Sequence, residues 1–258
     1  WGGALAALPF AIWFYLAIEG VANVAEEAKD PQRVIPRGFL SAMLTLVALT
    51  AITLFGAVGV GGWHHVVYPA AGSLETSDSP LPLAIAQVIS RDSPVFTLMT
   101  GVGLIGLLAS FHGILIAGSR ATLEFGRAGY APRILGEVNP KTRTPVAALL
   151  GNMVIGLIVL ATGQTNDIIL VTVFGALTLY ILSSAAVLQL RRREPELARP
   201  YRTPLYPVTP IVALVLSVGC VIAMAWSQPK LALLYAAMLA GSWILFAVFV
   251  PKNRRTRF

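Results

Sequence analysis

Long apolar runs dominate the chain, and short polar segments separate them. Each run is about 17–25 residues long, the length that an α-helix needs to cross a hydrocarbon core about 30 Å thick. Short alternating segments, which are typical of an outer-membrane β-barrel, are missing from the pattern. We therefore predict an all-α integral membrane protein with about seven transmembrane helices. Their expected positions are residues 8–27, 39–61, 94–119, 146–162, 168–190, 208–226 and 231–250.

The composition agrees with a membrane environment. Only 12% of the residues are charged, whereas a soluble domain carries about 25%. The mean hydropathy is +0.75. The net charge of +7 does not indicate nucleic-acid binding, because the basic residues follow the boundaries of the apolar runs.

Lysine and arginine gather in every second connection. Of the 19 basic residues, 17 follow the first, third and fifth runs or lie in the tail, and the other two are Arg91 and Lys230. Cytoplasmic loops carry the excess of basic residues. We therefore expect a multi-pass protein of the cell (inner) membrane with a cytoplasmic C-terminus. The first residue is then outside, which leads us to expect further spans upstream.

Two connections are longer than simple links. Residues 62–93 contain the apolar stretch Leu83–Ile89, which is too short to span a bilayer. Its apolar content favours a short helix over an outer vestibule rather than a disordered loop. Residues 120–145 mix aromatic and basic side chains. They fit either an amphipathic helix in the membrane interface or a solvated basic loop.

The first apolar run contains a carboxylate, Glu19, near mid-membrane, with Gly20 and Asn23 behind it. A buried charge costs several kcal/mol in a bilayer, so such residues usually face a cavity or a partner. Gly20 weakens the helix, and a helix broken at this depth can present backbone groups to a ligand. The sequence thus predicts a substrate site at Glu19. A glutamate that pairs with another helix is the alternative.

Aromatic and polar side chains elsewhere are further candidates. Trp13, Phe14 and Tyr15 precede Glu19 and could close over a cationic substrate through cation–π contacts, or they could form an interface belt. His112 could relay protons or bind substrate, or form a hydrogen bond between helices. Tyr180 fits either packing or a gate.

Motifs of other function classes are missing. The sequence has no CxxC, HExxH, Walker-type glycine loop or GxSxG, which argues against an ATP-driven pump and the common hydrolases. We predict no metal, no cofactor and no enzymatic activity. Cys220 stands alone in the sequence and cannot form an internal disulfide.

Three long motifs resemble the amino acid–polyamine–organocation (APC) superfamily. They are FYLAIEGVANVAEEAKDPQRVIPRG in the first run, SRATLEFGRAGYAPRILGEVNPKTRTPVAA after the third, and RRREPELARPYRTPLYPVTPI after the fifth. They are similar, in order, to that superfamily's sixth span, its loop between spans eight and nine, and its linker between spans ten and eleven. The details IEGVANVAEE, SDSPLPLAIAQV and ASFHGILIAGSRATLEFGR look most like bacterial ethanolamine permeases.

The resemblance implies a fold of two inverted five-helix repeats followed by two extra helices. The chain would be a single transmembrane domain with the second repeat at 1–190, a cytoplasmic linker at 191–207, and the extra helices and basic tail at 208–258. The superfamily's first and fifth helices would lie outside this sequence. Those N-terminal helices are then expected partners, and we expect that the chain by itself does not transport.

The resemblance also implies site residues. The family's sixth helix is unwound at mid-membrane, which places the break around Ala17–Gly20. The expected substrate-binding residues are Trp13, Phe14, Tyr15, Ala17, Ile18, Glu19, Gly20, Asn23 and His112. The expected gating residues are Trp13, Glu19 and Tyr180.

The function that follows is secondary active transport of a small organic amine, best matched by ethanolamine. Alternating access around the mid-membrane site is the expected mechanism, with proton-coupled symport or exchange, or another coupling ion. A general amino-acid permease is the alternative. A channel, which needs a repeated filter or rings of charge, and a membrane enzyme are disfavoured.

Overall fold

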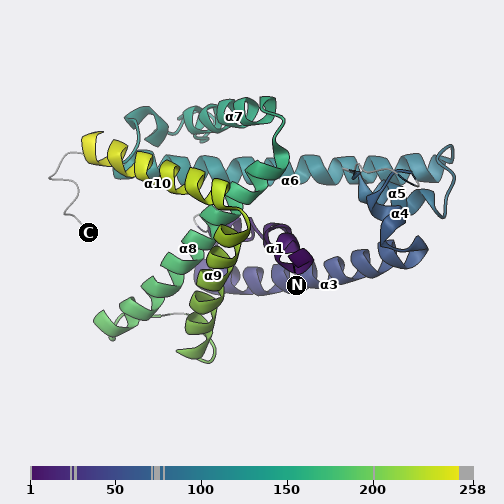
Figure 1. The fold of residues 1–258 in the computed structure, drawn as a ribbon. Helices are drawn as coiled ribbons and strands as arrows, with labels where there is room; N and C mark the ends of the chain where they lie inside the picture. The colour runs from purple at the N-terminus through teal and green to yellow at the C-terminus, as the bar shows by residue number, and fades with distance from the viewer. Residues whose placement is uncertain are drawn as a thin grey trace. The chain divides into compact units, whose positions relative to one another are not determined.

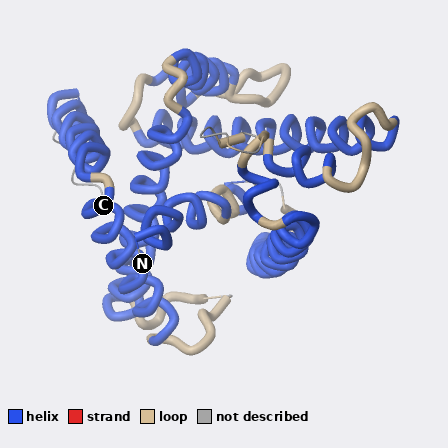
Figure 2. The backbone as a smooth tube through the Cα atoms, turned by 45° about the vertical axis from the view of Figure 1, so that its right-hand side comes forward, coloured by secondary structure: helices blue, strands red, loops and turns tan. Residues whose placement is uncertain are grey.

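The computed structural model describes residues 2–23, 25, 28–70, 72, 76–77, 79–199 and 201–249. Every regular element in these residues is helical (Figures 1 and 2). The basic tail, residues 250–258, lies outside the described part of the chain. The elements are α1 (Gly2–Phe14), α2 (Gly20–Asn23), α3 (Pro31–Gly61), α4 (Trp63–Val67), α5 (Pro80–Ala86), α6 (Pro94–Ala128), the 3₁₀ helix η2 (Arg133–Gly136), α7 (Val146–Ala161), α8 (Thr165–Arg193), α9 (Val208–Ser227) and α10 (Pro229–Phe249).

Each predicted apolar run corresponds to a helix or a pair of helices. Five described helices, α3, α6, α8, α9 and α10, are long and apolar enough to cross a membrane. The other two apolar helices are shorter: α1 has 13 residues and α7 has 16 residues. The apolar stretches of α3, α6 and α10 are unburied within the chain. An apolar surface of that extent is typical of contact with lipid or with further helices.

The predicted boundaries of three helices were wrong, and one of these helices is α1, which begins at Gly2 rather than at residue 8. α3 begins at Pro31 and α6 continues to Ala128, whereas the predicted spans begin at residue 39 and end at residue 119. The hydropathy pattern stops near the first charged residues, but arginine and glutamate are good helix formers and do not end a helix. α6 has 35 residues and is therefore about 52 Å long. For residues 120–145 the structure shows a continued helix followed by η2, rather than either alternative alone.

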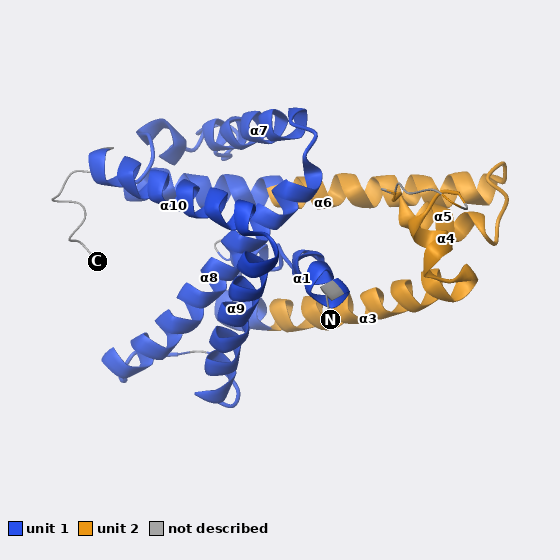
Figure 3. Cartoon of the chain, in the orientation of Figure 1, with its two compact units in different colours: residues 1–36, 115–258 blue, residues 37–114 orange. Residues whose placement is uncertain are grey.

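The chain divides into two compact units (Figure 3). One contains residues 1–36 and 115–258, and the other contains residues 37–114. The first unit has its core on α8, where Leu170, Val173, Phe174 and Leu177 are buried together with Met224 of α9. The spacing on α8 is that of one helix face. α1 and α10 also pack against α8 and α9.

In the second unit the loop predicted at 62–93 contains two short helices. α4 and α5 contact each other, and they bury Val66, Leu83 and Ala84. The short helix predicted from the stretch Leu83–Ile89 is therefore present as α5, which begins three residues earlier. Pro80 stands at its first position, where proline is favoured because no backbone N–H is needed. A place over an outer vestibule stays a prediction.

Candidate functional site

The first apolar run is broken between α1 and α2. α1 ends at Phe14, residues 15–19 form turns, and α2 begins at Gly20. Ala17 has a φ of 70°, a left-handed conformation that costs a non-glycine residue about 1–2 kcal/mol. The Gly20 N–H donates to the Ala17 carbonyl, three residues back, at 3.1 Å. The interruption predicted around Ala17–Gly20 is therefore present, and it begins at Tyr15.

Glu19 lies at the end of this break and contacts α8. The Tyr180 hydroxyl donates a hydrogen bond of 2.7 Å to Glu19 Oε1. The other carboxylate oxygen, Oε2, is buried and has no hydrogen-bond partner among the described residues. A buried carboxylate oxygen without a partner is costly. It can accept a hydrogen bond from an ammonium group.

Tyr180 is positioned by the core of the first unit. It lies one turn after Leu177 on α8 and is half-buried against the core. On the same helix, Thr178 accepts a hydrogen bond of 2.9 Å from the Tyr235 hydroxyl of α10. The Tyr235 ring stacks on Phe174, with ring centroids 5.6 Å apart. These contacts fix the rotation of α8 about its axis and therefore the direction of Tyr180.

Gly20 permits a close approach of α2 to α6. A Cβ atom at this position would lie 3.4 Å from the Ala117 side chain. An added Cβ atom would therefore contact α6 directly. Gly20 therefore has a packing role at the break, in addition to its effect on the helix.

An unpredicted polar contact joins α6 and α7. The Asn152 side-chain amide donates 2.9 Å hydrogen bonds to Thr122 Oγ1 and to the Ala148 carbonyl. Sequence reasoning missed Asn152, Thr178 and Tyr235. Their common signal is a polar group inside an apolar run, which usually has a partner on another helix.

The three aromatic candidates lie around the end of α1. Trp13 and Phe14 are 46% and 48% exposed, and Tyr15 is half-buried. The Phe14 and Tyr15 rings meet edge to face, with centroids 5.7 Å apart. Exposed rings at this position remain available to a substrate or to another helix, so their role stays a prediction.

The remaining candidates lie in three different segments of the chain. Ile18 is half-buried in the turn before α2. Asn23 ends α2, and its side chain falls outside the described part of the structure. His112 is exposed on α6 and belongs to the second compact unit. The roles predicted for these residues are unchanged.

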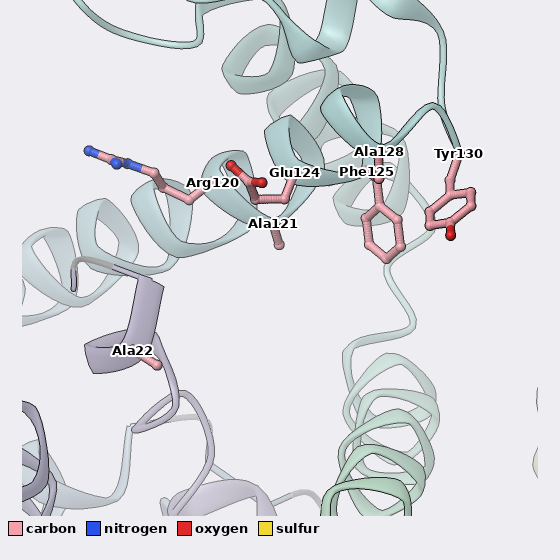
Figure 4. Close-up of a pocket in the computed structure, with 7 residues that line it drawn as sticks. All are labelled: Ala22, Arg120, Ala121, Glu124, Phe125, Ala128 and Tyr130. Carbon is pink, nitrogen blue, oxygen red and sulfur yellow. The ribbon is translucent and has the colours of Figure 1, made fainter. Parts of the chain in front are cut away.

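A hollow of about 460 Å³ lies beside α2 in the first unit (Figure 4). Ala22 lines it from α2, one turn after Glu19. Figure 4 shows Ala121 and Phe125 projecting from α6 toward the side on which Ala22 lies. Glu124 lines the rim and forms an ion pair of 2.8 Å with Arg127. The full lining is Ala22, Arg120, Ala121, Glu124, Phe125, Ala128 and Tyr130.

The described residues contain no group of three or more His, Cys, Asp or Glu side chains that could hold a metal ion. The polar groups gathered at the break between α1 and α2 are the Glu19 carboxylate, the Tyr180 phenol and the interrupted backbone. This arrangement can bind a small polar or cationic molecule.

Comparison with known proteins identifies a family. The chain is 27% identical over 250 residues to the branched-chain amino acid permease of Lactococcus lactis, covering 94% of the chain and 49% of that permease. It is 26% identical over 241 residues to the methylthioribose transporter of Bacillus subtilis, covering 92% and 46%. It is 22% identical over 249 residues to the mouse b(0,+)-type amino acid transporter 1, covering 91% and 46%.

The chain spans about half the length of the curated relatives it matches. These relatives are permeases and transporters, not enzymes. The amino acid permease family matches residues 2–257. The protein therefore belongs to the amino acid permease family of the APC superfamily.

Proposed function

We propose that the chain forms part of a secondary active transporter for a small organic amine, best matched by ethanolamine. The observation that carries this proposal is the buried, unpartnered Oε2 atom of Glu19 beside a broken helix. An ammonium group donates three hydrogen bonds and carries a full positive charge, so it satisfies this oxygen better than a neutral donor does. Tyr180 holds the other oxygen and fixes the orientation of the carboxylate.

The same atom offers a route to proton coupling. A carboxylate oxygen at this position can hold either a proton or the substrate's ammonium group, but not both. Binding of the amine then favours release of the proton, which is linkage between the two ligands. Such mutual exclusion supports exchange of a proton for the amine by alternating access around Glu19, whereas symport would need a separate proton site.

The hollow beside α2 fits the inward route of such a transporter. Ala22 lies three residues beyond Glu19, and its backbone N–H donates to the Glu19 carbonyl at 2.9 Å. Arg120, Glu124 and Tyr130 give the hollow polar groups at its rim. The excess of arginine and lysine at this end of α6 supports a cytoplasmic location, in a protein of the inner membrane with a cytoplasmic C-terminus.

An amino-acid substrate is the second candidate. Two of the relatives named above are amino acid transporters, whereas a third is named for methylthioribose. Relatives at 22% to 27% identity thus differ in substrate. An amino acid would present its ammonium group to Glu19 and would need a further site for its carboxylate, on helices supplied by the rest of the transporter.

Competition of uptake separates the two substrates. Cells that express the full-length gene would be given labelled ethanolamine together with an excess of unlabelled ethanolamine, leucine or arginine. We expect saturable uptake that only unlabelled ethanolamine suppresses strongly. A parallel assay would use labelled leucine or arginine with unlabelled ethanolamine as competitor. If the labelled amino acids enter, and ethanolamine neither enters nor competes, the amine proposal is wrong and the amino-acid alternative holds.

A further inference from the structure

A second pocket lies in the linker between α8 and α9, separate from the Glu19 site. Its volume is about 490 Å³. α8 ends at Arg193 and α9 begins at Val208 (Figure 1). The pocket therefore lies in the connection between two helices that are long and apolar enough to cross a membrane. Its lining residues are Arg191, Pro195, Glu196, Leu197, Ala198, Arg199, Arg202 and Tyr206.

The charge of the pocket is positive. Three arginines line it against a single carboxylate, Glu196. Neither Arg191 nor Arg202 takes part in an ion pair within the described residues. Unneutralised guanidinium groups that share one pocket repel each other and favour an anionic ligand.

Arg191 has a fixed position in the pocket. Its guanidinium carbon lies 4.0 Å from the centroid of the Tyr206 ring. A cation–π contact of this kind uses the flat face of the guanidinium. The N–H groups at the edge of the plane remain free to donate, in the fork geometry that matches a phosphate.

Arg199 holds the shape of the linker. Its guanidinium donates hydrogen bonds to the backbone carbonyls of Glu194, Pro195 and Leu197. These carbonyls follow the last turn of α8 and would otherwise need water. The wall of the pocket is therefore set by the chain itself, before any ligand arrives.

Exposed apolar side chains occur in the pocket lining and next to its residues in the linker sequence. Leu205 is 80% exposed, and Leu197 and Tyr201 are about half exposed. Exposed leucine and tyrosine next to arginines, at the ends of two spanning helices, is the pattern of the membrane–water interface. A ligand that combines an anionic group with acyl chains would satisfy both parts of this surface.

We propose that this pocket binds the phosphate group of an anionic phospholipid headgroup at the cytoplasmic surface. Arg191 and Arg202 bind the phosphate oxygens, and Leu205 and Tyr201 lie against the upper acyl chains. Basic pockets between transmembrane helices on the cytoplasmic side are suited to such headgroups. Glu196 opposes the anion and lowers the affinity.

Lipid retention by the purified protein tests the proposal. Protein in detergent micelles would be mixed with phosphatidylglycerol or phosphatidylcholine, and bound lipid would be counted by native mass spectrometry. We expect preferential retention of phosphatidylglycerol. The double variant R191Q/R202Q should bind it about tenfold more weakly or worse, because it removes the two guanidinium groups that donate directly to the phosphate oxygens.

The variant R192Q/R193Q is the matched control. It removes the same charge from neighbouring residues that do not line the pocket, and it should retain phosphatidylglycerol nearly as the wild type does. An equal loss in both double variants would mean that only the overall charge matters, and it would overturn the pocket assignment.

Two further measurements exclude misfolding and free phosphate. The variant Glu196→Gln removes the opposing carboxylate and should strengthen phosphatidylglycerol binding several-fold, a gain that a damaged fold does not produce. Inorganic phosphate at millimolar concentration should not displace the lipid, because it lacks the acyl chains. Unchanged binding in Glu196→Gln, or displacement by inorganic phosphate, would contradict the proposal.

Discussion

At the scale of single residues, the proposed site depends on a hydrogen bond between Glu19 and Tyr180. The sequence around either residue does not predict this bond. Glu19 is a carboxylate in an apolar run, and Tyr180 is a tyrosine in another run 161 positions away. The structure joins them at 2.7 Å and leaves Glu19 Oε2 buried without a partner in the described residues. A phenol that holds one carboxylate oxygen fixes the direction of the other.

Tyr180→Phe should weaken substrate binding without preventing folding. Loss of the hydrogen bond frees the Glu19 carboxylate to rotate, and a net contribution of about 1 kcal/mol corresponds to a threefold to tenfold rise in the KM of uptake. Concentration-dependent uptake checks this value. Tyr235→Phe is the control, because it loses a hydroxyl bonded to Thr178 and should lower thermal stability slightly while leaving KM unchanged. Equal KM values for all three proteins would count against the pair.

Ala17→Gly should raise thermal stability. Ala17 has a positive φ, and glycine adopts this conformation without the penalty of about 1–2 kcal/mol that a Cβ atom brings. Ala11→Gly lies within α1, where glycine costs about 1 kcal/mol, so it should have the opposite effect. The melting temperatures of the purified variants in detergent measure the expected rise for Ala17→Gly and the expected fall for Ala11→Gly. A lower melting temperature for Ala17→Gly would show that the break has a regular helical conformation.

At the scale of elements, the chain relies on close backbone contacts between helices and turns. Gly126 in α6 and Gly136 in η2 meet so closely that a Cβ atom at Gly126 would overlap the Gly136 backbone. Together with the Asn152–Thr122 hydrogen bond, this contact fixes the connection from α6 to α7. Small residues and isolated polar groups of this kind are the usual means of helix packing in membranes.

Gly126→Ala should destabilise the protein by about 1–3 kcal/mol, the usual range for overpacking, because backbone rather than a flexible side chain must move. Gly219→Ala in α9 is the matched control. Nothing lies within 4 Å of a Cβ atom at that position, and alanine favours a helix over glycine. Fluorescence-detected melting of both variants provides the comparison. An unchanged melting temperature for Gly126→Ala would mean that η2 does not rest on α6.

The pattern of apolar runs predicted the existence and type of the spanning helices, but not their ends. Hydropathy marks only the apolar part of a helix. The backbone hydrogen bonds of the helix continue through charged residues, so α3 and α6 extend beyond the predicted spans. The break at Ala17–Gly20 was predictable because glycine and a carboxylate coincide there. The bond from Tyr180 to Glu19 was not, since it depends on how α1 and α8 pack and on the rotation of α8 set by Phe174 and Tyr235.

At the scale of the whole molecule, the chain is about half of the length of its relatives, and it belongs to a family of permeases. The division into a repeat at 1–190, a linker and two extra helices stays a prediction, as do the roles of Trp13 and His112. The two compact units each contain a predicted candidate, Glu19 in one and His112 in the other.

The most direct test is saturable uptake of labelled ethanolamine by cells that carry the full-length gene with Glu19→Gln. Glu137→Gln is the control, because Glu137 is exposed and lies outside the site. Glutamine has nearly the same shape as glutamate but no charge, so it cannot pair with an ammonium group or exchange a proton. The account predicts that Glu19→Gln abolishes uptake and that Glu137→Gln leaves it unchanged, at equal amounts of protein in the membrane. Normal uptake by Glu19→Gln would contradict it.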